Sequence, residues 1–219
     1  MEGTCLVISP LIALMEDQVN QLLKRGIKAA YINSSLHFKD IDRILDNVIY
    51  GNIKILYLSP ERLKTTLFID RFKKMNVSFV AVDEAHCISE WGNDFRPEYR
   101  NISSLRTFNK GLSFIALTAT ATPEVVEDIE EQLSFKESNK IKKSFKRNNI
   151  HYSVINAIDK EKVLVKLLTN ESSIIYVRNR KKTKELSKLL NSKNYKTDFY
   201  HAGLDFRERS EKQTKWINN

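Results

Sequence analysis

Residues 79–86 read FVAVDEAH, four apolar residues followed by two acids, an alanine and a histidine. The apolar run predicts a buried strand that presents Asp83 and Glu84 at its carboxyl end. Ligands of open parallel sheets bind at that edge. Phosphoryl transfer from a nucleotide needs a carboxylate that holds Mg²⁺ and a group that orients water, so Asp83 suits the first task and Glu84 the second. A bare Asp-Glu pair would better fit the start of a turn or a helix cap, but the following Ala85 and His86 favour the nucleotide site.

The sequence around this run predicts an α/β fold. Short apolar, β-branched runs alternate with segments of helical period, as in parallel strands joined by crossover helices. One helical stripe ends at Gly26, a second follows a cap at Ser34 or Ser35, and another opens at Pro123. The predicted strands are Cys5–Ser9, Ala29–Ile32, Ile53–Leu58, Val77–Val82 and Leu112–Leu117.

A second series of elements follows a break in this pattern. Residues 134–150 are polar and rich in lysine, which indicates a connection between a first domain at 1–133 and a second at 151–219. In the second domain, strands are predicted at Val154 and at Ile174–Val177. Helices are predicted around Val163–Leu168 and Leu186–Leu190. We expect this second domain to be cut short, because so few residues lie near the lower limit for an independent core.

The composition favours a polyanionic partner in a reducing compartment. The net charge is +9 and the pI is about 9.4, which suits nucleic acid, although a basic surface often serves only solubility. Cys5 and Cys87 lie far apart and match neither a disulfide framework nor a zinc site, so no structural metal is expected. No apolar run approaches a membrane span, so we expect a cytoplasmic protein.

A longer stretch carries a family resemblance. DEAHCISEWGNDFRPEYR (83–100) resembles the Walker B motif and aromatic-rich loop of RecQ-family DNA helicases. DEAH-box RNA helicases share the first four letters, but CISEWG and DFRPEY are far more specific to RecQ proteins. Other segments resemble motifs of that family in the family's order: LVISPLIALMEDQV (6–19), YLSPERL (57–63), ALTATATPEV (116–125), SIIYVRNRKKTKELSKLL (173–190) and FYHAGL (199–204).

The resemblance implies two RecA-like lobes that use ATP and Mg²⁺ to unwind DNA in the 3′ to 5′ direction, in recombination and repair. It implies DNA partners at a junction of single strand and duplex, near the nucleoid if the source is bacterial. Asp83 would hold the Mg²⁺. The implied catalytic set is Asp83, Glu84, His86, Thr118 and Thr120. The implied DNA-binding set is Ser9, Pro10, Arg62, Trp91, Phe95, Arg96 and Arg180.

The aromatic-rich loop fits DNA on chemical grounds as well. Trp91, Phe95 and Tyr99 alternate with arginines, so the rings could stack on bases while guanidinium groups hold phosphates. The alternative is that Trp91 and Phe95 fill the core. The loop departs from the family at Glu90 and Asn93, where glutamine and histidine are usual. Asn93 cannot carry a proton, so a coupling that relies on an imidazole is not expected there.

A phosphate-binding loop is missing from the sequence. None of the six glycines is followed by lysine, so no Gly-Lys pair can cradle the phosphates. We expect a fragment without the P-loop, without motifs V and VI, and without ATP hydrolysis on its own. The open alternatives are a non-catalytic nucleic-acid-binding module or remnant that keeps the basic track, and an RNA helicase of the DEAH class.

Overall fold

The computed structural model describes residues 2–33, 36–92, 94–137, 139–144, 146–169 and 171–218. The chain forms two compact units, Met1–Lys143 and Ser144–Asn219. The predicted helix cap at Ser34 or Ser35 and the departure at Asn93 lie outside the described residues.

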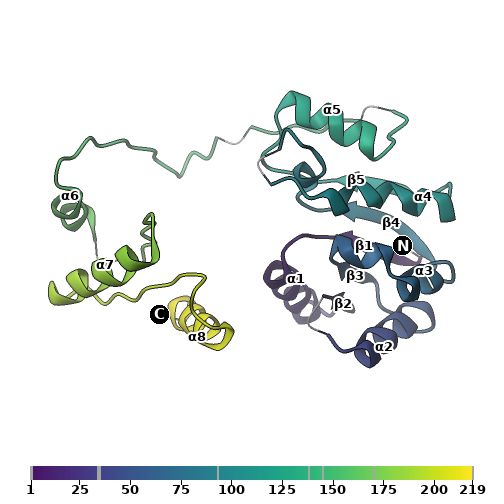
Figure 1. Cartoon of the computed structure of the whole chain (residues 1–219), viewed down its shortest axis with the longest axis horizontal. Helices are drawn as coiled ribbons and strands as arrows, with labels where there is room; N and C mark the ends of the chain where they lie inside the picture. Colours follow the sequence, from purple (N-terminus) through teal and green to yellow (C-terminus); the bar gives the residue numbers. More distant parts are fainter. Residues whose placement is uncertain are drawn as a thin grey trace. The chain divides into compact units, whose positions relative to one another are not determined.

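A five-stranded parallel sheet forms the centre of the first unit (Figure 1). The strands follow the order β2-β3-β1-β4-β5, and every neighbouring pair is parallel. The prediction of an α/β fold with at least five strands is confirmed. The strand bounds are β1 Thr4–Ile8, β2 Ala29–Ile32, β3 Ile55–Leu58, β4 Val77–Val82 and β5 Ser113–Ala116.

Successive residues of a strand point to opposite faces of the sheet. Apolar residues therefore lie on both faces, and helices cover them. Val7 packs with Met15 and Val19 of α1, while Leu6 and Ile8 join a larger apolar core. The predicted helix starting at Pro123 is confirmed as α5. The helices of this unit are α1 Ile12–Lys24, α2 Phe38–Ile49, η1 Pro60–Lys64, α3 Thr66–Phe72, η2 Ala85–Ile88, η3 Pro97–Ser104, α4 Leu105–Phe108 and α5 Pro123–Gln132.

The strand order decides which loops meet. β1 and β4 are central neighbours, and β5 pairs with β4 on its other side. Their carboxyl ends therefore bring together three segments that are far apart in sequence: the residues after Ile8, after Val82 and after Ala116.

The second unit contains the helices α6 Lys160–Leu167, α7 Arg180–Ser192 and α8 Phe206–Ile217. Both predicted helices are present, and α8 was not predicted. The predicted strands at Val154 and Ile174–Val177 are wrong, since this unit has no strand in its described part. Val154 and Tyr176 are more than 90% exposed. A parallel strand needs a hydrogen-bonded neighbour, and within the described residues no backbone hydrogen bond joins either segment to another strand.

None of the helices that the structure describes is long and apolar enough to cross a membrane.

Candidate functional site

Asp83 is held in a fixed orientation at the carboxyl end of β4. Its backbone N–H donates to the carbonyl of Ile8 at 2.9 Å, which extends the β1–β4 pairing by one residue. The buried Ser9 hydroxyl donates to Asp83 Oδ2 at 3.2 Å. The backbone N–H of Glu84 donates to Asp83 Oδ1 at 3.0 Å. Each carboxylate oxygen thus accepts one protein hydrogen bond and retains a free lone pair.

Glu84 follows in a left-handed backbone conformation, with φ +47° and ψ +46°. A residue with a Cβ atom pays about 1–2 kcal/mol for this conformation. Neighbouring hydrogen bonds hold the turn: Ala85 N–H donates to the Leu117 carbonyl at 2.9 Å, and Cys87 N–H donates to the Glu84 carbonyl at 2.9 Å. These contacts at the packed edge of the sheet therefore hold the turn in its strained conformation.

His86 connects Glu84 to the segment after β5. Its Nδ1 atom lies 3.2 Å from Glu84 Oε2 and 3.1 Å from the hydroxyl oxygens of both Thr118 and Thr120. One ring nitrogen thus has three oxygen partners, and it can act as donor to only one of them at a time. All five residues predicted as the catalytic set, together with Ser9, lie at this one edge.

Arg96 ties the aromatic-rich loop to the segment after β1. Its Nη1 donates to the Pro10 carbonyl at 3.2 Å, and its Nη2 donates to Asp94 Oδ2 at 3.1 Å. Burial alone would lower the pKa of Arg96, but the hydrogen bond and charge of Asp94 raise it overall. Ser9, Pro10 and Arg96 therefore form one side of the site.

The three aromatic residues of the loop have different environments. Trp91 is 79% exposed, so the alternative that it fills the core is wrong. Phe95 is half-buried, with the Arg100 guanidinium 5.1 Å from its ring centroid. Tyr99 is fully buried and its hydroxyl donates to the backbone carbonyl of Asp83 at 3.0 Å. Tyr99 is therefore unavailable for base stacking, and no pattern in the sequence indicated its bond to Asp83.

The family of this chain follows from its sequence. Residues 1–129 match the family described as DEAD/DEAH box helicase. The chain belongs to this family. It is 41% identical to the ATP-dependent DNA helicase RecQ of Bacillus subtilis (strain 168) over 222 residues, which is 100% of this chain and 38% of that protein. It is 40% identical to RecQ of Pasteurella multocida (strain Pm70) over 215 residues, or 97% of this chain and 34% of that protein.

These relatives confirm the resemblance of this DEAD/DEAH box chain to RecQ helicases. The chain spans 38% and 34% of the length of these two curated relatives. Among solved structures, Mycobacterium smegmatis helicase Lhr bound to ssDNA and AMP-PNP has a TM-score of 0.66 at 19% identity, covering 97% of this chain and 32% of that chain. S. cerevisiae Dbp5 bound to RNA and ADP BeF3 has a TM-score of 0.64 at 18% identity, covering 99% of this chain and 55% of that chain. At such identities, these two structures show a shared RecA-like fold.

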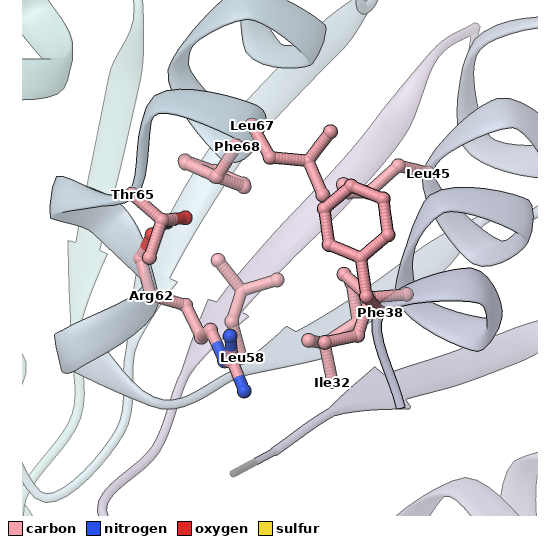
Figure 2. Close-up of a pocket in the computed structure, with 9 residues that line it drawn as sticks. Ile32, Phe38, Leu45, Leu58, Arg62, Thr65, Leu67 and Phe68 are labelled. Carbon is pink, nitrogen blue, oxygen red and sulfur yellow. Dashed lines mark hydrogen bonds between the residues drawn. The ribbon is translucent and has the colours of Figure 1, made fainter. Parts of the chain in front are cut away.

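Arg62 of this DEAD/DEAH box protein lies in η1. Its Nη2 donates to the Asn33 carbonyl at 2.9 Å, and its side chain lies at the rim of an apolar cavity of about 190 Å³ (Figure 2). Phe38, which is 67% exposed, lines the same cavity. Arg180 belongs to the second unit, where it lines a basic pocket with Lys181, Lys184 and His201. Arg62 is thus not hydrogen-bonded to the Asp83 cluster, and Arg180 belongs to the other unit.

The donor set at Asp83 fits Mg²⁺. Mg²⁺ is usually held by one or two carboxylates together with water and substrate phosphates, rather than by a closed protein cage. Asp83 offers such a carboxylate, oriented by Ser9 and the Glu84 N–H. No group of three His, Cys, Asp or Glu side chains that could hold a metal occurs within the described ranges. An Mg²⁺ ion here would therefore depend on the nucleotide for further ligands.

Proposed function

We propose that this chain is part of an ATP-dependent DNA helicase of the RecQ kind that moves in the 3′ to 5′ direction. In this proposal, residues 1–133 belong to the first motor lobe, 134–150 to the connection, and 151–219 to the second lobe. The observation that carries the proposal is the linked cluster of Asp83, Glu84 and His86 beside a loop with an exposed Trp91.

The residues of the cluster would have different roles in ATP hydrolysis. Asp83 would hold Mg²⁺, which when bound supplies positive charge to the phosphate oxygens. The Glu84 carboxylate would orient a water molecule and accept its proton. His86 Nδ1 lies beside the Glu84 carboxylate and beside the hydroxyls of Thr118 and Thr120, so the position of Glu84 depends on the segment after β5.

DNA would run over the side of the first unit that carries the aromatic-rich loop. Trp91 and Phe95 would stack on bases, since every base offers a π-face. Arg62 and Arg96 would hold phosphates in the first unit, with Pro10 beside Arg96, and Arg180 would hold a phosphate in the second unit. Ser9, predicted to bind DNA, is buried and its hydroxyl is bonded to Asp83 instead. The net charge of +9 favours such a polyanion. The natural substrate would be a single strand next to a duplex, and the protein would act with DNA in the cytoplasm, at the nucleoid in a bacterium.

The test uses the full-length product of the gene. We expect ATP hydrolysis stimulated by single-stranded DNA, and unwinding of a duplex with a 3′ tail but not of one with a 5′ tail. Glu84→Gln should lower the hydrolysis rate by about 10²- to 10⁴-fold while DNA binding persists. Glu127→Gln, on the exposed side of α5, is the matched control and should leave hydrolysis unchanged.

Two outcomes would contradict the proposal. One is turnover that Glu84→Gln does not reduce. The other is tighter binding of RNA than of DNA at the same salt concentration, which would favour an RNA helicase instead.

A further inference from the structure

The buried hydroxyl of Tyr99 contacts the backbone of the hydrolytic segment. Tyr99 is 0% exposed, and its Oη donates to the Asp83 carbonyl at 3.0 Å across 16 residues of sequence. A buried phenol hydroxyl needs a hydrogen-bond partner, and here the partner is a main-chain atom of the residue proposed to hold Mg²⁺. Burial also raises the pKa of Tyr99, so the phenol remains a protonated donor.

The same peptide group continues the connection to the carboxylate. The carbonyl that accepts from Tyr99 belongs to the peptide whose N–H, on Glu84, donates to Asp83 Oδ1 at 3.0 Å. Hydrogen bonds on both ends of one peptide polarise it and strengthen each other. A chain of two hydrogen bonds therefore runs from the Tyr99 hydroxyl through the peptide to the Asp83 carboxylate.

This peptide is also the one that precedes the left-handed Glu84. A strained conformation persists only where its surroundings fix it. The Tyr99 bond restrains the carbonyl side of the peptide, while Ala85 N–H is held by the Leu117 carbonyl beyond the strained residue. The direction of the Glu84 side chain thus depends on contacts that include Tyr99.

At its other end, Tyr99 is joined to the aromatic-rich loop. Its N–H donates to the Arg96 carbonyl at 2.9 Å, within the first turn of η3. Arg96 in turn is bonded to the Cys87 carbonyl through its backbone and to the Pro10 carbonyl through its side chain. Tyr99 is therefore held at its backbone as well as at its hydroxyl.

We propose that Tyr99 is a positioning residue whose buried hydroxyl holds the Asp83–Glu84 peptide and so sets the direction of the two acids. The inference rests on the proposed function, because it assigns a role within that site. It predicts that the Tyr99 hydroxyl affects the rate of hydrolysis and leaves the binding of DNA and ATP unaffected.

The experiment replaces Tyr99 with phenylalanine in the full-length product of the gene. Tyr99→Phe keeps the buried ring and removes only the donor. We expect kcat of DNA-stimulated ATP hydrolysis to fall about 3- to 10-fold, as for the loss of one hydrogen bond. The KM for ATP and the Kd for single-stranded DNA should remain within about twofold, since no ligand-facing group has changed. The half-saturating Mg²⁺ concentration should rise.

Tyr31→Phe is the matched control. Tyr31 is half-buried on β2, against the apolar cluster of Met15 and Val19, and its hydroxyl makes no hydrogen bond to any residue the structure describes, so this change should leave kcat unaltered. An equal loss in both variants would indicate general loosening of the core and overturn the inference. If Tyr99→Phe does not fold, Pro97→Ala decides the question, because it loosens the start of η3 at an exposed position. Unchanged kcat in that variant would overturn the inference.

The two proposals fail in different ways. A wild-type protein without DNA-stimulated hydrolysis refutes the proposed function. An active wild type with a fully active Tyr99→Phe variant refutes only the role of Tyr99.

Discussion

Arg100 Nη2 lies 3.1 Å from Glu90 Oε1. The same guanidinium lies 5.1 Å from the ring centroid of Phe95, so an acid, a base and an aromatic ring lie side by side in the aromatic-rich loop. Glu90 is one of the two positions at which the loop departs from the RecQ pattern. Glu90 is therefore paired with Arg100, which could otherwise bind a phosphate.

Glu90→Gln is expected to tighten binding of single-stranded DNA by about two- to fivefold at low salt, because an exposed pair of this kind is weak and its loss frees Arg100. Fluorescence anisotropy with a labelled oligonucleotide measures the change. Glu127→Gln should not alter binding. Weaker binding in Glu90→Gln would show that the pair instead holds the loop in its binding conformation.

Trp91→Ala should weaken binding of single-stranded DNA by about 1–3 kcal/mol for each base stacked on Trp91, roughly 5- to 160-fold. Its melting temperature should match that of the wild type, because Trp91 is 79% exposed. Tyr50→Ala removes another exposed aromatic, 76% accessible at the end of α2, and should bind DNA normally. Unchanged DNA affinity in Trp91→Ala would exclude stacking at this position.

Both thiols should resist alkylation in the folded protein. Burial raises the pKa of Cys5 and Cys87 from 9.0 to about 11. Each raised pKa contributes stability that is complete below pH 9 and is lost as the pH rises through about 11. Mass spectrometry after iodoacetamide at pH 8 should show modification only in denaturant. Urea titrations at pH 8 and 10.5 should show a smaller loss of stability in a Cys5→Ala, Cys87→Ala variant.

Arg106 should stabilise the first unit through its stem and guanidinium. It donates to the carbonyls of Leu133 and Leu112 at 3.1 and 2.8 Å and lies 4.1 Å from the Phe114 ring centroid. Arg106→Met removes both hydrogen bonds and should lower the free energy of unfolding by about 2 kcal/mol. Arg43→Met, at an exposed ion pair on α2, should have little effect in the same urea titration.

The 219-residue chain purified alone should show no DNA-stimulated ATP hydrolysis above background. Its sequence has no Gly-Lys pair, and a glycine-rich loop with lysine is the main phosphate-binding surface of such motors. A phosphate-release assay with and without single-stranded DNA measures this. Turnover that Glu84→Gln abolishes would prove the expectation wrong.

Local periodicity made much of the first unit predictable. Apolar runs such as Phe79–Val82 predict strands, and the stripes between them predict helices, because each pattern repeats within a few residues. The same reasoning failed for Ile174–Val177, which is apolar but unpaired in the described part of the second unit. Whether a strand pairs depends on residues far away in the sequence, so a short apolar run cannot predict the pairing. The domain limits at 133 and 151 remain predictions.

The sequence by itself determined that two acids follow a buried strand and that threonines follow another, since strand ends and motifs are local. Only the tertiary structure decided that the Asp83 carbonyl meets the Tyr99 hydroxyl and that Arg106 reaches the carbonyl of Leu133. Tyr99 lies in an irregular segment, where no period reveals which side chain is buried. Such contacts depend on how the strand order β1-β4-β5 folds distant loops onto one edge, and that order arises from packing of the whole unit.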